Sequence, residues 1–139
     1  MSPSKLGRGR LAALAFVLAA HTSATVAQTP PASPGPDAIR ALLLRTSAWT
    51  VEFGPRSRPT AWAATMVFAD RDGTLIATMD SAATGWQCER PVALSADGFS
   101  YRGCSDRPIS IKLDPNDDAV PFKGRDGYDD YVFRFIPKK

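Results

Sequence analysis

The chain has 139 residues, of which 44% are hydrophobic and 22% are charged, and its formal net charge is +3. This length supports one small domain with its own core but not two domains. Two cysteines and one histidine are too few thiolates and imidazoles for the usual structural zinc or iron–sulfur sites.

Residues 1–27 have the layout of a secretory signal peptide. Lys5, Arg8 and Arg10 form a positive start, residues 11–20 are apolar, and residues 25–27 (TVA) offer small side chains at a cleavage site. The apolar run is well short of the ~20 residues that a membrane-spanning helix needs. We therefore expect cleavage after residue 27, no membrane span afterwards, and export to a bacterial periplasm or to the cell exterior.

Cleavage would change the charge and the available chemistry. It would leave 112 of the 139 residues, with 14 basic residues against 14 acidic ones and no histidine. The basic residues are dispersed, whereas a nucleic-acid binder carries them as a stripe, so we expect no nucleic-acid partner. Without histidine, Ser-His-Asp and Cys-His triads and histidine-ligated metal sites are excluded.

A short helix is predicted at the start of the domain. Residues 28–36 (QTPPASPGP) are predicted to form a proline-rich spacer. Asp37 is predicted to cap a helix over residues 38–46, in which Ile39, Leu42 and Leu43 share one face at the helical period. The single folded domain is expected to cover residues 37–139.

From Trp49 onwards the apolar residues alternate with period two, which indicates strands. Turn residues divide the segments, at 70–73 and 97–98 among other places, and Pro121 marks an edge strand. The pattern predicts a mainly β fold: a small antiparallel β-barrel, half-barrel or sandwich of about seven or eight short strands, with one short N-terminal α-helix. The predicted strand segments are 49–53, 62–68, 75–80, 86–90 with 92–96, 99–104, 109–113, 120–123 and 131–136.

Cys88 and Cys104 are predicted to form a disulfide, because an exported protein enters an oxidising compartment. The alternatives are two free thiols or a redox pair, but a redox pair usually has the close Cys-x-x-Cys spacing that is absent here.

The register of the hairpin around residues 97–98 bears on this disulfide. A two-residue Asp-Gly turn there sets Leu94 opposite Tyr101. The same register sets Pro91 opposite the second cysteine, so the cysteines meet only if the ladder slips. We therefore expect a bulge at Pro91, at Gly103 or at both.

Two acidic loops are candidate calcium sites. Residues 114–118 (DPNDD) begin like a calcium loop, but Ala119 and Arg125 stand where glycine and glutamate are required. The second loop, residues 126–130, carries three aspartates. Both loops are interpreted as solvated turns, and we expect neither a metal site nor a cofactor.

Aromatic residues are the remaining candidates for a site. Trp49 and Trp62 each begin an alternating apolar face and are expected in the core. Trp86 follows a small-residue loop and, together with Tyr128, is the candidate binding surface. Tyr131 is expected to point inward rather than to extend that surface.

Glu52 and Glu89 are the only glutamates and would be the acid and base of a small hydrolase. Both alternate with apolar neighbours and are expected to face solvent. With no catalytic motif and no histidine in the mature chain, we expect no enzymatic activity and assign no catalytic residues.

An exported helix and barrel with a tryptophan on the first strand is similar to the lipocalins, although Ser47 stands where that family's Gly-x-Trp pattern has its glycine before Trp49. The resemblance implies a hollow barrel that carries a small apolar ligand. Against this, large side chains are expected to fill the barrel: Trp62, Met66, Phe68, Phe99, Tyr101, Phe133 and Phe135.

The leading hypothesis is therefore a non-enzymatic binding or interaction module of the bacterial cell envelope or exterior, with an envelope or extracellular macromolecule as partner. The alternative is a lipocalin-like carrier of a small apolar ligand, and the third is a small hydrolase that uses carboxylates.

Overall fold

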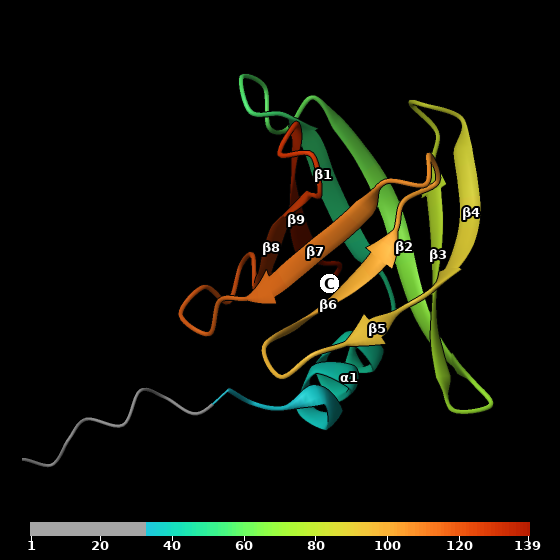
Figure 1. Cartoon of the computed structure of the whole chain (residues 1–139), viewed down its shortest axis with the longest axis vertical. Coiled ribbons are helices and arrows are strands. Elements are labelled where there is room, and N and C mark those ends of the chain that lie inside the picture. The colour runs from blue at the N-terminus through green and yellow to red at the C-terminus, as the bar shows by residue number, and fades with distance from the viewer. Residues whose placement is uncertain (1–32) are drawn as a thin grey trace, which may run out of the picture. The chain divides into compact units, whose positions relative to one another are not determined.

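Nine antiparallel strands form one sheet that curls into a nearly closed barrel in the computed structural model, which describes residues 33–139 (Figure 1). The predicted mainly β class is confirmed, with slightly more strands than expected. The predicted signal peptide and most of the predicted spacer lie outside the described residues. The strands are β1 (Trp49–Pro55), β2 (Trp62–Arg71), β3 (Thr74–Ser81), β4 (Trp86–Pro91), β5 (Ala93–Leu94), β6 (Gly98–Arg102), β7 (Pro108–Leu113), β8 (Phe122–Asp126) and β9 (Tyr131–Pro137).

The strand order is β4-β3-β2-β1-β9-β8-β7-β6-β5, so the chain follows two meanders that are joined where β1 pairs with β9. The two outer strands of the sheet, β4 and β5, are consecutive in the chain and are separated by Val92 alone. The sheet therefore returns almost to its starting point. We call the gap between β4 and β6, which no ladder bridges, the seam of the barrel.

Helix α1 (Pro36–Arg45) lies at one end of the barrel (Figure 1). Ile39 and Leu43 are fully buried, and the indole Nε1 of Trp49 donates to the Leu43 carbonyl at 3.3 Å, which ties the helix to β1. No helix within residues 33–139 is long and apolar enough to cross a membrane.

The predicted N-cap of this helix is wrong. Gly35 is the N-cap, with φ of 92°, and Pro36, which was predicted in the spacer, is the first helical residue. Proline suits this position because its fixed φ is helical and its missing N–H would have no partner there. Asp37 lies inside the first turn, where its charge complements the helix dipole.

The core fills the half of the barrel next to α1. Phe99 lies at its centre and makes edge-to-face contacts with Phe68, Phe122 and Phe135 at centroid distances between 5.3 and 5.5 Å. Trp49 is also buried and packs edge-on against Phe122 at 5.6 Å. This half holds a buried aromatic core, as the large inward residues predicted.

The hairpin register predicted around residues 97–98 is wrong by two residues. Leu94 pairs with Phe99 rather than with Tyr101, and the Ser95 amide donates to the Gly98 carbonyl at 2.9 Å, which closes the turn. Gly98 therefore follows the turn. It is required because a Cβ atom there would lie 2.0 Å from the carbonyl oxygen of Ile111 on β7.

The predicted bulge is wrong for the same reason. The β5–β6 ladder ends at the pair formed by Ala93 and Ser100, before it reaches Pro91 or Gly103. Strand β4 pairs with β3 instead, with Pro91 opposite Ile76.

The edge strand predicted at residues 120–123 is wrong both in its bounds and in its place at an edge of the sheet. Strand β8 covers Phe122–Asp126 and lies between β7 and β9, inside the sheet. Pro121 immediately precedes it, so the missing N–H of proline does not interrupt the ladder.

Candidate functional site

A pocket of about 380 Å³ opens at the end of the barrel opposite α1. In Figure 1 this is the upper end, where the β1–β2, β3–β4, β6–β7 and β8–β9 loops lie. We call it the end pocket. Its lining is largely apolar, and six of the lining residues are aromatic: Phe53, Trp62, Trp86, Tyr101, Tyr131 and Phe133.

Small residues explain why this half of the barrel is hollow. Ala64, Ser81 and Gly103 line the end pocket at positions that point inward. The Ser81 hydroxyl donates to the Ala63 carbonyl at 3.2 Å, so it does not present an unpaired polar group to the cavity. In the other half of the barrel, next to α1, larger side chains point inward, among them the buried Phe68, Phe99, Phe122 and Phe135.

Cross-strand pairing brings the aromatic walls together. Phe53 on β1 pairs with Trp62 on β2 and with Phe133 on β9. The Phe53 and Phe133 rings are 5.7 Å apart and only 13° from parallel. Trp62 also contacts Tyr131, with a centroid distance of 6.1 Å. The wall is therefore a continuous aromatic surface over three adjacent strands.

Trp86 reaches across the pocket mouth. It begins β4, which β3 and β2 separate from β1 in the sheet, yet its ring lies 6.4 Å from that of Phe53 and 17° from parallel. Its backbone is placed by a tight turn in which the Gly85 amide donates to Ser81 at 2.8 Å. The side chain remains 45% exposed, so part of it is open to solvent or to a ligand.

Arg107 is the charged residue of the pocket lining. Its Nη1 donates to Asp126 Oδ2 at 2.8 Å and to Asp130 Oδ2 at 3.3 Å. Its Cζ lies 5.1 Å from the ring centre of Tyr131 and 5.4 Å from that of Tyr128, which is within cation–π range. Two carboxylates and two aromatic rings thus hold the guanidinium at the rim.

Asp126 is the buried anchor of this arrangement, with a fully buried side chain. Burial by itself raises the pKa of Asp126, but hydrogen bonds from Arg107 and from the amides of Asp130 and Tyr131 outweigh it. The pKa therefore lies below its ordinary value, and the carboxylate is charged at neutral pH.

Tyr101 lines the end pocket and is 5% exposed. Among residues 33–139, its hydroxyl is the one buried side-chain polar atom without a hydrogen-bond partner. Burial raises the pKa of Tyr101 above its ordinary value, so the group is a neutral hydroxyl. A buried hydroxyl with no partner is uncommon, and because the oxygen itself is buried, it is not presented to the open end pocket.

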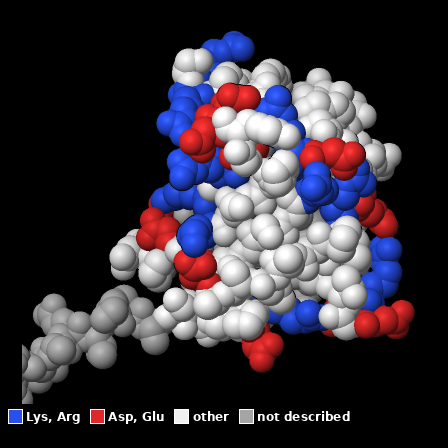
Figure 2. All heavy atoms as spheres, viewed as in Figure 1, with Lys and Arg blue, Asp and Glu red and all other residues white. Residues whose placement is uncertain are grey.

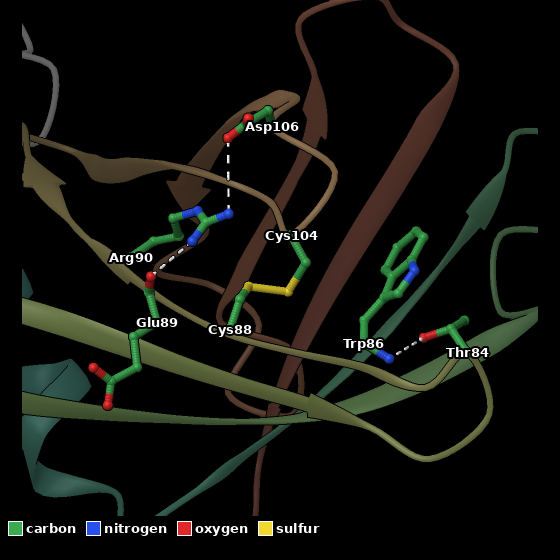
Figure 3. Close-up of a disulfide and its surroundings, with 7 residues drawn as sticks. All are labelled: Thr84, Trp86, Cys88, Glu89, Arg90, Cys104 and Asp106. Atoms are coloured by element: carbon green, nitrogen blue, oxygen red, sulfur yellow. Dashed lines mark hydrogen bonds and ion pairs between the residues drawn. A yellow bond between two sulfur atoms is a disulfide. The ribbon is translucent and has the colours of Figure 1, made fainter.

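The predicted disulfide between Cys88 and Cys104 is present, with a Cα–Cα distance of 5.7 Å (Figure 3). It crosses the seam, from β4 to the β6–β7 loop, rather than stapling one hairpin. Arg90 and Asp106 form an ion pair at 3.7 Å beside it. Trp86 lies on the same side of β4 as Cys88 (Figure 3), and Cys104 itself lines the end pocket. The bond therefore supports the pocket wall.

Of the two residues of the candidate binding surface, Trp86 and Tyr128, only the first lies in the end pocket. Trp86 lines the end pocket, whereas Tyr128 is 63% exposed and stands outside the lining, linked to it through Arg107. Tyr131 points inward, as predicted. Trp49 is in the core, as predicted, but Trp62 is not, because it borders the cavity.

Arg107 and Phe53 were missed as site residues. Alternation indicated that Phe53 points inward, but nothing local distinguishes an inward residue that packs from one that borders a cavity. Arg107 stands in an irregular loop, so the sequence carried no sign of its contact with Asp126, which is 19 residues away.

The glutamates do not converge. Glu89 pairs with Arg71 at 3.1 Å and Glu52 pairs with Arg134 at 3.2 Å, both on the outside of the barrel. In the first acidic loop, Asp114 and Asp117 both bind Lys123. No group of three or more metal-ligating side chains is found within residues 33–139.

Charges of both signs are interspersed on the outer surface. Figure 2 shows acidic and basic side chains next to one another around a largely uncharged area. Lys112, Lys123 and Arg134 stand opposite one another on β7, β8 and β9, but each has a carboxylate partner. This row therefore presents little net charge to a partner.

In comparisons with known proteins, the chain matches no family model, no curated protein and no solved structure.

Proposed function

We propose that this protein is an exported, non-enzymatic binding protein that holds a small apolar ligand in the end pocket. The observation that carries the proposal is the pocket itself, with a volume of about 380 Å³ and aromatic walls. Ligand sites are commonly apolar clefts of ~300–1,000 Å³ with a few polar groups, and the end pocket has that size and composition.

The geometry favours a ligand carrier over a module that binds a macromolecule. The macromolecular hypothesis depended on a barrel filled by its own side chains. Only the half next to α1 is filled, whereas Trp62 and Phe133 border the cavity. Trp86 is exposed at the mouth of a concave site rather than on a flat patch, which suits a small ligand better than a large partner.

We expect saturable binding of the apolar probe 1-N-phenylnaphthylamine to the oxidised protein, measured as a rise in probe fluorescence. Replacing Ala64 with leucine should lower the affinity about ten-fold or more, because the added side chain occupies the end pocket. The matched control is Ala63→Leu, which adds the same group one residue away on the exposed outer face of β2. Absence of saturable binding, or equal losses in the two variants, would contradict the proposal.

The proposed export has its own test. The Cys88–Cys104 disulfide supports an oxidising compartment. We expect the intact mass of the protein recovered from its native host to correspond to a chain that begins at Gln28, with both thiols oxidised, in the periplasmic or extracellular fraction. A chain that keeps residues 1–27 and carries two free thiols would rule out this part of the proposal.

A further inference from the structure

We infer that the ligand of the end pocket is a planar aromatic compound that carries a neutral hydrogen-bond acceptor, such as a carbonyl oxygen. Its ring would lie against the aromatic walls below Trp86, and its acceptor would meet Arg107. The inference rests on the proposed function and narrows it to one class of ligand.

The preference for a planar ring follows from the shape of the walls. Three rings from three different strands, those of Trp86, Phe53 and Phe133, are all close to parallel, with interplanar angles of 17° and 13° between successive rings. Parallel faces offer a flat ring extensive contact in an offset stack, and such aromatic pairs are more favourable than their buried area alone predicts. A flexible acyl chain gains no such contact and loses more conformational freedom when it is bound.

The preference for an acceptor follows from Arg107. A guanidinium has five N–H donors, and within residues 33–139 the side-chain hydrogen bonds of Arg107 all come from Nη1. The Nε and Nη2 donors of this lining residue therefore remain for a ligand.

The preference for a neutral acceptor follows from the charge at the rim. Arg107 is already bound by two carboxylates, those of Asp126 and Asp130. The net charge of these three groups is negative, so an anionic ligand would be repelled, whereas a carbonyl oxygen can accept a hydrogen bond without that penalty.

The contributions of the planar ring and of the carbonyl acceptor can be measured separately with three ligands that compete with 1-N-phenylnaphthylamine for the oxidised protein. 2-Acetylnaphthalene has both the ring and the carbonyl, 2-ethylnaphthalene has the same ring and carbon skeleton without the oxygen, and 2-decanone has the carbonyl without the ring. We expect 2-acetylnaphthalene to bind about ten-fold more tightly than 2-ethylnaphthalene, as for a hydrogen bond from a charged donor. We also expect it to bind at least ten-fold more tightly than 2-decanone.

Arg107→Lys tests the assigned donor, because lysine keeps the positive charge beside Asp126 but replaces the guanidinium donors. This variant should reduce the preference for 2-acetylnaphthalene over 2-ethylnaphthalene from about ten-fold to less than three-fold. The control is Arg102→Lys, whose side chain binds the Asp106 carbonyl and lies outside the lining; it should leave the preference unchanged. Trp86→Leu should weaken both naphthalenes but not 2-decanone.

The outcomes distinguish the two levels of the proposal. If the fluorescent probe binds but the three ligands compete equally, the inferred ligand class is wrong and the proposed function stands. If neither the probe nor any ligand binds, the proposed function itself is wrong. The comparison of the three ligands on the unmodified protein decides the ligand class even if Arg107→Lys does not fold.

Discussion

Replacing Cys88 and Cys104 together with alanine is expected to lower the free energy of unfolding by about 3 kcal/mol, the value that the chain-entropy model assigns to a closed loop of roughly 15 residues. The two cysteines are 16 positions apart in the chain. A domain of this size typically has a net stability of only ~5–15 kcal/mol. The loss is therefore a large part of the whole, and urea unfolding at neutral pH would measure it.

The position of the disulfide adds a second consequence for the double variant. Because the bond crosses the seam, where no hydrogen-bonded ladder joins β4 to β6, its removal leaves that part of the barrel held by side-chain contacts alone. Gly103, Cys104 and Ser105 line the end pocket, so the affinity for 1-N-phenylnaphthylamine should fall together with stability.

Reduction of the unmodified protein provides the control, since dithiothreitol should reproduce the urea midpoint of the double variant. A double variant that unfolds within about 1 kcal/mol of the oxidised protein would show that the seam holds without the bond.

Replacing Asp126 with alanine is expected to lower the free energy of unfolding by about 3 kcal/mol, the lower end of the range for breaking a buried ion pair. The carboxylate accepts hydrogen bonds from Arg107 and from two backbone amides in the turn between β8 and β9. Alanine would leave those donors without this acceptor in a largely buried place. The exposed Asp129 of the same turn is the control. Because its φ is 61°, it is replaced with asparagine, which tolerates that conformation, and Asp129→Asn should lose less than about 1 kcal/mol.

Asp126 should also make stability depend on pH. Its pKa is lower in the folded protein than in the unfolded chain, where an aspartate titrates near ~3.9. The charged carboxylate therefore stabilises the fold fully above that pH, and the contribution is lost as the pH falls through the lowered folded-state pKa. Urea midpoints measured from pH 7 down to pH 2 should fall less steeply for Asp126→Asn than for the unmodified protein. Parallel curves would contradict this assignment.

Much of the fold could be read from local patterns. Alternation of apolar residues identified the strands, because one face of each strand is buried in a barrel. The β2–β3 turn was also recognisable, because an Asp-Gly pair suits a turn in which both central residues have positive φ. In the structure Asp72 and Gly73 have φ of 54° and 88°. The disulfide followed from the cysteine count and the expected export.

Other features depended on neighbours that are distant in the chain. The Asp97-Gly98 pair resembles a turn, but Gly98 is required by the close approach of Ile111 on β7, which no local pattern reveals. Pro121 suggested an edge strand, although β8 begins one residue later and is paired on both sides.

The sequence by itself determined the β class, most of the strand segments, the disulfide pair and most of the aromatic residues that point inward, because each depends on local backbone preference or simple counting. Only the tertiary structure decided that the barrel is filled at one end and open at the other. Whether an inward residue packs or borders a cavity depends on the summed volumes of side chains from many strands. Here Ala64 on β2, Ser81 on β3 and Gly103 after β6 together leave the space that Trp62 and Trp86 surround.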